Sequence, residues 1–305
     1  MTNTRKKTSF PILMSKFLVV ALFELLSRVP LRLLHGIGAL MGWLTYWLSG
    51  DYAARLRENL GRDGKGRSAE ELRAVLRANV TEAGKSMAEL PWVWRRPLEQ
   101  VLAKVKECQG WELVDAAQTQ GKGLIILTPH IGCFEVIGLY LGAHTPMTCM
   151  YRVPKLAWMD VVVRQGRERG QMKLARADIG GVRTLLKALK RGEVIGILPD
   201  QVPSNGEGEW TPFFGRPAYT MTLVTRLLQT SGATVLMCVA ERLPQGAGYA
   251  MRFTPLEFTA DASVTLQINR AVEAAVRSCP TQYLWSYNRY KVPRGVQPPA
   301  PTGAA

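Results

Sequence analysis

The fold is decided by a short apolar run that leads into a histidine, Gly123-Leu124-Ile125-Ile126-Leu127-Thr128-Pro129-His130. A run of this length, apolar throughout and bounded by glycine, is typical of a parallel strand that is covered on both faces. Pro129 cannot continue the ladder, so the strand should end there. In open α/β sheets, sites form at the carboxyl ends of the strands. The sequence therefore predicts that His130 lies at this edge of a sheet.

A carboxylate follows the histidine at a fixed spacing, in His130-Ile131-Gly132-Cys133-Phe134-Glu135. Five residues along a helix turn by about 500°, or roughly 140° around the axis, so the two side chains cannot share one regular helical face. We therefore expect His130 in the turn and Glu135 in the first turn of the next helix, reaching back to the imidazole. A carboxylate on one ring nitrogen leaves the other free to accept a proton. His130 and Glu135 are thus candidate catalytic residues. The other histidines, His35 and His144, lack such a partner in the sequence and are expected to be structural or exposed.

Beyond Gly110, short apolar runs alternate with helical patterns, which predicts an α/β fold with a mixed, mainly parallel sheet flanked by helices. Strands are expected over 124–128, 147–151, 172–175, 194–198, 233–240 and 249–256. Helices are expected over 134–142, 156–168, 180–191, 218–230 and 264–278. A capping box at Ser68-Ala69-Glu70-Glu71 should start a further helix that runs to about Leu90, where Pro91 ends it.

The N-terminal 50 residues differ from the rest because a basic start precedes two apolar stretches. Glu24, Arg28 and Arg32 interrupt these stretches, so neither reaches the roughly 20 uninterrupted residues of a comfortable membrane span. Basic residues lie on both flanks, around positions 5–7 and 55–67, and they favour the cytoplasmic side. We expect a membrane-associated helical segment, either a hairpin or an interfacial anchor in one leaflet. A signal peptide would have a similar start, but no A-x-A cleavage site follows.

The simplest partition of the 305 residues is an anchor, one catalytic domain and a tail. The anchor would cover residues 1–50 and the catalytic domain residues 51–291. The tail, 292–305, is rich in Pro, Gly and Ala and is expected to be disordered.

The formal charge of +15 indicates an anionic partner: nucleic acid, acidic lipid head groups or an acidic carrier protein. Nucleic acid is disfavoured, because the basic residues are dispersed and no zinc-finger, RNP or compact Arg/Lys-rich motif is present. The five cysteines are odd in number and form no C-x-x-C pair. This pattern predicts a reducing compartment, with neither structural disulfides nor a metal site.

Several motifs follow His130 in a fixed order: Tyr151-Arg152, Gly166-Arg167, Leu198-Pro199-Asp200-Gln201, Pro212-Phe213-Phe214-Gly215 and Trp285-Ser286-Tyr287-Asn288-Arg289-Tyr290-Lys291. With the N-terminal segment they span nearly the whole chain, which resembles the late acyltransferases of lipid A biosynthesis. These are the lauroyl/myristoyl group of the H-x4-D/E glycerolipid acyltransferase superfamily. The resemblance implies a glycerolipid-acyltransferase-like fold and transfer of a fatty acyl chain from acyl carrier protein to a hydroxyl of an anionic glycolipid. It places the reaction at the cytoplasmic face of the inner membrane and implies no cofactor, since acyl carrier protein is the donor substrate.

The resemblance also implies roles for single residues. His130 and Glu135 match the family's dyad, Arg167 its W/Q-G-R block, and Asp200 the acidic residue that closes a later strand. Gln201 departs from the pattern, because some relatives have a histidine and a second acid after the aspartate. Arg167 and Asp200 are therefore candidate substrate-binding residues, and Arg152 is a further one because its guanidinium suits a phosphate.

Each of these assignments has a plainer alternative. Arg152, Arg167 and Arg289 could bind phosphate through a bidentate guanidinium contact, or they could be solvated charges or structural ion pairs. Asp200 could instead cap a helix or loop.

Acyl transfer from a thioester needs a base for the attacking hydroxyl and a donor for the oxyanion. His130 suits the first role, and Arg167 or a backbone N–H near the turn suits the second. Three other functions remain open from the residues alone. The acceptor could be a lysophospholipid or an aminolipid, a hydrolase could use Cys133 or Ser204 with His130, and a non-enzymatic membrane-binding module would explain the basic anchor. The hydrolase is disfavoured because neither candidate nucleophile lies in a nucleophile elbow.

Overall fold

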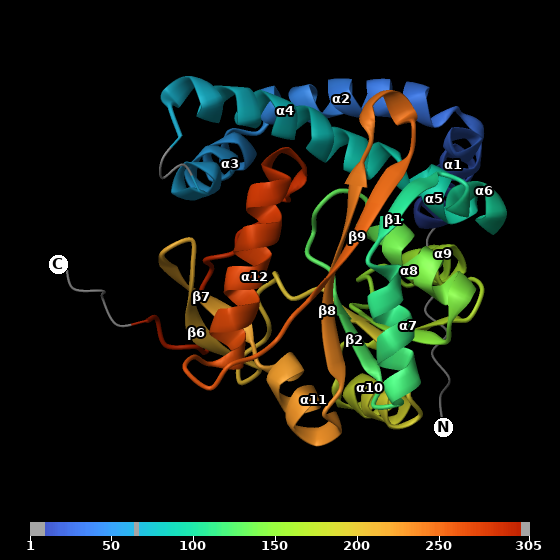
Figure 1. Ribbon diagram of the computed structural model, residues 1–305. Coiled ribbons are helices and arrows are strands. Elements are labelled where there is room, and N and C mark those ends of the chain that lie inside the picture. The colour runs from blue at the N-terminus through green and yellow to red at the C-terminus, as the bar shows by residue number, and fades with distance from the viewer. Residues whose placement is uncertain (1–9, 64–66, 300–305) are drawn as a thin grey trace, which may run out of the picture.

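The computed structural model describes residues 10–63 and 67–299. A seven-stranded sheet runs through the molecule in the order β1-β9-β8-β2-β5-β3-β4 (Figure 1). Its strands are β1 (Val105–Gln109), β2 (Leu124–Leu127), β3 (Met147–Tyr151), β4 (Met172–Arg176), β5 (Val194–Ile197), β8 (Thr234–Arg242) and β9 (Tyr249–Pro255). β8 and β9 are antiparallel, whereas the other neighbours are parallel. The predicted α/β fold with a mixed, mainly parallel sheet is confirmed.

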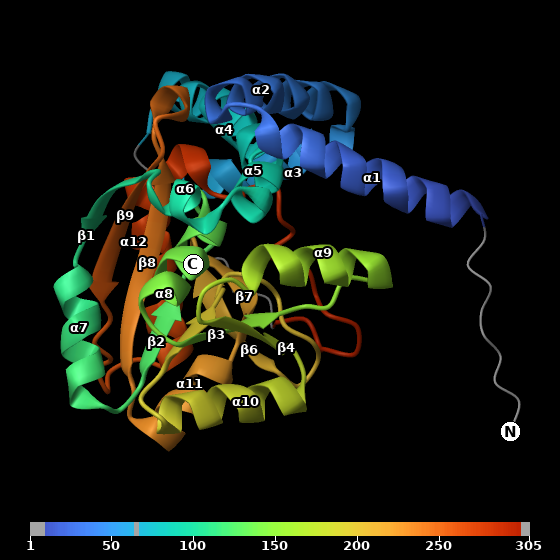
Figure 2. The same ribbon diagram turned by 90° about the vertical axis from the view of Figure 1, so that its right-hand side faces the viewer.

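Helices cover both faces of the sheet and one of its ends (Figures 1 and 2). They are α1 (Phe10–Arg28), α2 (Leu31–Leu48), α3 (Gly50–Asp63), α4 (Ala69–Ala88), α5 (Leu90–Arg95), α6 (Leu98–Leu102), α7 (Trp111–Gln120), α8 (Phe134–His144), α9 (Ala157–Arg167), α10 (Ile179–Lys190), α11 (Leu223–Ser231) and α12 (Val264–Ser278), with short 3-10 turns η1 (Pro244–Gly246) and η2 (Pro280–Gln282).

Strand β2 lies in the middle of the sheet and is completely buried. Side chains alternate between the faces of a strand. Leu124 and Ile126 accordingly pack with side chains of α7 and α8. Ile125 and Leu127 pack with side chains of α10, α11 and α12. The run is apolar at every position because both faces of the strand lie in the core, as the sequence predicts.

Helices α2 and α4 lie side by side across the end of the sheet (Figure 1). Their close approach depends on glycine, because a Cβ on Gly42 would lie 2.2 Å from the carbonyl oxygen of Val80 and one on Gly84 would lie 1.9 Å from that of Gly38. The capping box of α4 is present as predicted: the side chain of Ser68 accepts from the N–H of Glu71, and the side chain of Glu71 accepts from the N–H of Ser68. Helix α2, which lies in the predicted N-terminal segment, thus packs directly against α4.

No helix within the described residues is both long enough and apolar enough to cross a membrane. A membrane-associated N-terminal segment is thus not confirmed by the structure. The basic residues predicted around positions 5–7 lie outside the described residues, as does the end of the predicted tail, 300–305. Residues 292–299 form no helix or strand, and Trp210 donates a hydrogen bond to the carbonyl oxygen of Gln297.

The element predictions between 124 and 200 agree with the structure to within two residues at each end, but the predicted helix 218–230 is wrong in its first part. A separate hairpin is formed there by β6 (Gly208–Phe213) and β7 (Arg216–Met221). Phe214 and Gly215 form its two-residue turn with φ values of 45° and 72°, the backbone that hairpins of this length favour. Helix α11 begins only at Leu223. Strand β1 and helix α7 were not predicted.

Candidate active site

His130 lies three residues beyond the end of β2, with its ring mostly buried and bonded to Asp200. The Nδ1 atom of His130 is 2.8 Å from Oδ1 of Asp200. The backbone N–H of His130 donates to Oδ2 of the same carboxylate over 2.9 Å. Because both bonds come from one residue, Asp200 fixes the main chain of His130 as well as the plane of its ring. An ionised carboxylate accepts only, so Nδ1 carries the proton and Nε2 is the basic nitrogen.

Two neighbouring strands bring these residues together. β2 and β5 are parallel, with Leu127 opposite Ile197, and the N–H of Thr128 extends the ladder by donating to the carbonyl oxygen of Ile197. The chain then continues through Pro129 on one strand and Pro199 on the other. His130 and Asp200 therefore leave the sheet at equivalent positions.

The second ring nitrogen of His130 faces Gln201. The side-chain amide nitrogen of Gln201 is 3.1 Å from Nε2, at the place where a substrate hydroxyl would have to give up its proton. The ring of Phe134 packs edge-on against the imidazole at 4.8 Å between centroids. These contacts leave the His130 ring little freedom to rotate.

The ionised form of Asp200 is favoured despite its burial. Burial by itself raises the pKa of this carboxyl, but the charge of His130 and the hydrogen bonds from its ring and backbone lower it, so the pKa lies below its ordinary value. A carboxylate in this state stabilises an imidazolium when His130 takes a proton.

The predicted contact from Glu135 to the imidazole is wrong. Glu135 does lie in the first turn of α8, but its buried carboxylate points to Arg167 and Trp94. Nε of Arg167 donates to Oε2 over 2.8 Å, Nη2 donates to Oε1, and the indole N–H of Trp94 donates to Oε2 over 3.0 Å. The bonds of Glu135 go to Arg167 and Trp94, whereas Nδ1 of His130 is bonded to Asp200. By geometry the orienting role belongs to Asp200, for which the sequence predicts substrate binding instead.

Arg167 is held from two sides. Its guanidinium group donates hydrogen bonds to Glu135, and its guanidinium carbon lies 5.6 Å from the centre of the Trp94 ring. The side chain is still 24% exposed, so part of it faces outward. No sequence pattern links Trp94 to this site, because Trp94 lies on α5 and nearly 40 residues separate it from the His130–Glu135 motif.

The two other predicted arginines lie in opposite environments. Arg152 is exposed in the segment after β3, where it is open to a ligand. Arg289 is buried, and it donates to the carbonyl oxygen of Tyr219 and to Oγ1 of Thr220 over 2.7 Å each. Binding of phosphate or carrier by Arg289 is therefore excluded, because the guanidinium serves the structure of the β6–β7 hairpin.

The ring nitrogens of His130 contact Asp200 and Gln201, and not the hydrolase candidates Cys133 and Ser204. Cys133 is buried, and its burial raises the pKa of the thiol well above the ordinary value, with the nearby Glu89 raising it further. A thiol in this state is not a thiolate near neutral pH. Ser204 is exposed in the loop before β6. The arrangement around His130 instead suits a base that activates a hydroxyl supplied by a substrate.

Comparison with known proteins agrees with this chemistry. The family model described as bacterial lipid A biosynthesis acyltransferase matches residues 1–292. The lipid A biosynthesis lauroyltransferase of Escherichia coli is 28% identical over 287 residues, which cover 92% of each chain. The lipid A biosynthesis palmitoleoyltransferase of the same organism is 29% identical over 241 residues, covering 77% of each. A lipid A biosynthesis acyltransferase of Haemophilus influenzae is 26% identical over 286 residues, covering 90% of this chain and 89% of its own.

Proposed function

The chain belongs to the bacterial lipid A biosynthesis acyltransferase family, and we propose that it transfers a fatty acyl chain from acyl carrier protein to a hydroxyl of a lipid A precursor at the cytoplasmic face of the inner membrane. It is an acyltransferase. The observation that carries the proposed mechanism is the His130–Asp200 pair, which leaves Nε2 of His130 as a base at the carboxyl edge of the sheet.

In this mechanism the acceptor hydroxyl takes the place of the Gln201 amide beside Nε2 of His130. As its oxygen attacks the thioester carbonyl, the proton moves to Nε2, and Asp200 stabilises the imidazolium. The tetrahedral intermediate collapses with loss of the carrier thiolate, which takes the proton from His130. General base catalysis of this kind contributes roughly 10²- to 10⁴-fold. The displaced amide of Gln201 is a candidate donor to the oxyanion, because it lies beside the same nitrogen.

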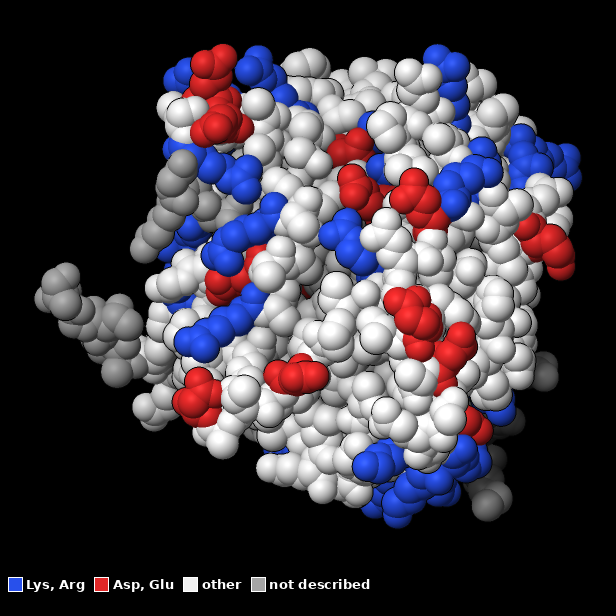
Figure 3. Space-filling view, in the orientation of Figure 1, with Lys and Arg blue, Asp and Glu red and all other residues white. Residues whose placement is uncertain are grey.

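No acyl-enzyme is needed, because the thioester of the donor is already activated. An acidic carrier and a phosphorylated acceptor both fit the formal charge of +15. On the face drawn in Figure 3 the basic side chains form several separate clusters with acidic side chains between them. This face therefore offers separate positions for local anionic contacts.

Arg167 is the leading candidate for a phosphate contact with the acceptor. Hydrogen bonds to Glu135 and the ring face of Trp94 hold its guanidinium, while its exposed part can make a second charge-assisted bond. Arg152 is a further candidate because it is exposed and follows β3 at the same edge of the sheet.

The outer surface of the N-terminal helices supports docking on the membrane. α2 buries one face against α4, and its opposite face carries exposed apolar side chains at alternating spacings of four and three residues. These are Leu33, Ile37, Leu40, Leu44 and Trp47. A helix with such an unpartnered apolar stripe can lie in the plane of the interface. In this proposal residues 1–50 dock on the bilayer and residues 51–291 carry the chemistry.

An assay with purified full-length chain tests the proposal. Lauroyl, myristoyl and palmitoleoyl forms of acyl carrier protein are offered with a lipid A precursor or a lysophospholipid, because the relatives' names differ in the acyl chain. We expect transfer to the lipid A precursor. His130→Ala should abolish it, while His144→Ala, a change of an exposed histidine, should leave it intact. Preferred acylation of the lysophospholipid, or full activity of His130→Ala, would overturn the proposal.

A further inference from the structure

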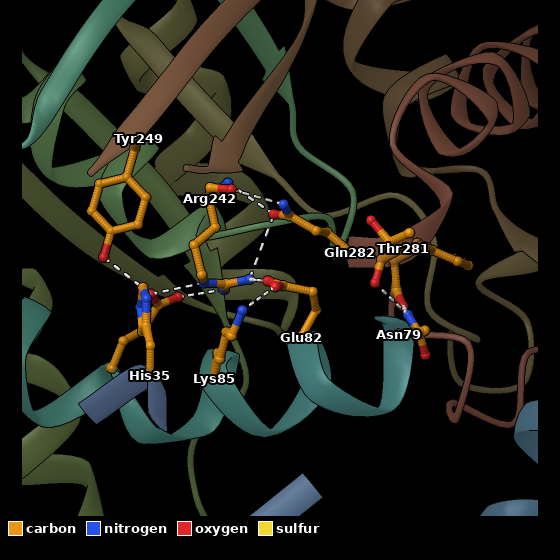
Figure 4. A network of polar contacts seen from close by, with 10 residues as sticks. His35, Asn79, Glu82, Lys85, Arg242, Tyr249, Thr281 and Gln282 are labelled. Atoms are coloured by element: carbon orange, nitrogen blue, oxygen red, sulfur yellow. Dashed lines mark hydrogen bonds and ion pairs between the residues drawn. The ribbon is translucent and has the colours of Figure 1, made fainter. Parts of the chain in front are cut away.

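A network of polar and charged side chains is centred on Arg242 and reaches from His35 to Gln282 (Figure 4). Its centre is Arg242, at the end of β8, whose Nε donates to Oε2 of Glu89 over 3.0 Å and whose Nη1 donates to Oε2 of Glu82 over 2.8 Å. Glu89 also meets Nε2 of His35 at 3.0 Å and the hydroxyl of Tyr249 at 3.1 Å. α2, α4, β8 and β9 are thus joined at one point.

The network continues to the C-terminal segment through Gln282. The side-chain amide of Gln282 pairs with the backbone of Arg242 in both directions: Oε1 accepts from its N–H over 2.8 Å, and Nε2 donates to its carbonyl oxygen over 2.9 Å. Figure 4 shows Gln282 reaching Arg242 from the side opposite to His35 and Tyr249. This bidentate contact fixes the main chain of residues 280–284 against the end of β8.

The same segment holds the His130 loop. The N–H of Gly132 donates to the carbonyl oxygen of Gln282 over 3.1 Å, and the N–H of Leu284 donates to the carbonyl oxygen of His130 over 3.0 Å. Gly132 has a φ of 59°, and a Cβ there would lie 2.0 Å from the carbonyl oxygen of Ala240. The loop therefore cannot move away from the sheet without breaking contacts on both sides of His130.

Asn79 of α4 gives the segment a second support. Its Nδ2 donates to the carbonyl oxygens of Thr281 and Tyr283 over 2.9 and 2.8 Å. The side-chain amide nitrogens of Asn79 and Gln282 bond backbone carbonyl oxygens and not the His130 ring, so both residues act on His130 through the backbone of 281–284.

We propose that Gln282 is a positioning residue for His130, holding the backbone of the catalytic loop through the Arg242 network. The inference rests on the proposed function, in which Nε2 of His130 accepts the proton of the acceptor. A displacement of about 1 Å in such a group can lower the rate by roughly 10²-fold, so the loss of this support should appear in kcat.

The test compares Gln282→Ala with Gln267→Ala in the full-length chain. Gln267 is also half-buried, and its side-chain amide likewise accepts from the N–H of Thr259 and donates to the carbonyl oxygen of Thr259, far along the chain from the His130 loop. We expect Gln282→Ala to lower kcat by about ten-fold or more with acceptor KM changed less than about two-fold. Gln267→Ala should leave both constants unchanged. Gln282→Met, which keeps the volume but not the amide, should behave like Gln282→Ala.

Hydrogen exchange supplies a readout that does not depend on activity. The amide hydrogens of Gly132 and Leu284 should exchange faster in Gln282→Ala than in the native chain. Their exchange rates should be unchanged in Gln267→Ala. Exchange that is the same in all three chains, or an equal fall of kcat in both alanine variants, would overturn the inference. A native chain that transfers no acyl group would instead refute the proposed function and leave the exchange result to stand.

Discussion

His130 and Asp200 occupy equivalent positions on two neighbouring parallel strands, each three residues beyond the paired residues Leu127 and Ile197. Their side chains meet at 2.8 Å between Nδ1 and Oδ1. The base and the carboxylate that orients it are therefore held by the register of the sheet. Two residues that are far apart in the sequence form a rigid unit because parallel strands end at the same edge of the sheet.

Gln201→Glu should move the acidic limb of the kcat/KM profile to higher pH. The new carboxylate would lie beside Nε2 of His130, where the Gln201 amide is now 3.1 Å away, and would stabilise the imidazolium. Since only the neutral ring can accept a proton, the variant should need more alkaline solution than the native enzyme to reach half of its maximal kcat/KM. The uncharged Gln201→Ala serves as the control. Superimposable profiles of Gln201→Glu and the native enzyme would show that Gln201 does not face the base.

Arg167→Ala should impair the enzyme more than Arg167→Lys. Lysine keeps a positive charge near Glu135 but cannot reproduce the two-point contact made through Nε and Nη2. We expect the acceptor KM to rise in the order native, lysine, alanine, measured with a phosphorylated acceptor. Equal acceptor KM values in all three enzymes would remove Arg167 from substrate binding.

The Glu89 carboxylate should contribute to the loss of stability in acid. Burial disfavours its charge, but Arg242 and His35 outweigh burial and lower the pKa of Glu89 from 4.5 to about 2. A group whose pKa is depressed on folding stabilises the protein above its unfolded pKa. Its contribution is therefore complete above about pH 4.5 and lost as the pH falls towards 2.

Glu89→Gln should lower the free energy of unfolding at neutral pH, because it leaves Arg242 buried without its main partner. The variant should then lose less stability than the native chain between pH 4.5 and 2. Urea unfolding followed across this range measures both effects, with Glu70→Gln, a change on the exposed side of α4, as the control. Parallel curves for Glu89→Gln and the native chain would contradict the assignment.

The double variant Leu40→Glu/Leu44→Glu should weaken binding to vesicles that contain anionic lipid. Both side chains lie on the exposed stripe of α2, and carboxylates would be costly in the interface. Ile179→Glu, a change of an exposed apolar side chain on α10, is the matched control and should bind as the native chain does. Co-sedimentation provides the measurement. Removal of the whole segment 1–48 is less informative, because it also takes away His35 and the buried contacts of α2 with α4. If the double variant and the control bind equally well, α2 is not the docking surface.

The elements between residues 124 and 200 were predictable because the central strands β2 and β5 are short runs buried at every residue, and regular helical patterns separate the strands. The β6–β7 hairpin was missed because its second strand, Arg216–Met221, runs directly into α11 and the two were read as one helix. Its turn depends on Phe214 with a positive φ, which few non-glycine residues adopt.

His130, Asp200, Glu135 and Arg167 were all selected from the sequence, but their pairing was not. Sequence distance favoured Glu135 as the partner of His130, whereas the pairing depends on which strands are neighbours. That order follows from packing of the whole sheet, and no local pattern encodes it. The matching Pro129-His130 and Pro199-Asp200 dipeptides, each after a buried strand, were the available signal.

The most direct test of the account measures the ¹⁵N chemical shifts of the His130 ring in the native chain, in Asp200→Asn and in Glu135→Gln. The chain has three histidines, and His130→Ala identifies the signals. We predict that the His130 ring is protonated at Nδ1 and unprotonated at Nε2, both in the native chain and in Glu135→Gln. Asp200→Asn should change this pattern, because the acceptor at Nδ1 loses its charge. A native pattern in Asp200→Asn together with a changed one in Glu135→Gln would contradict the claim that Asp200 orients the base.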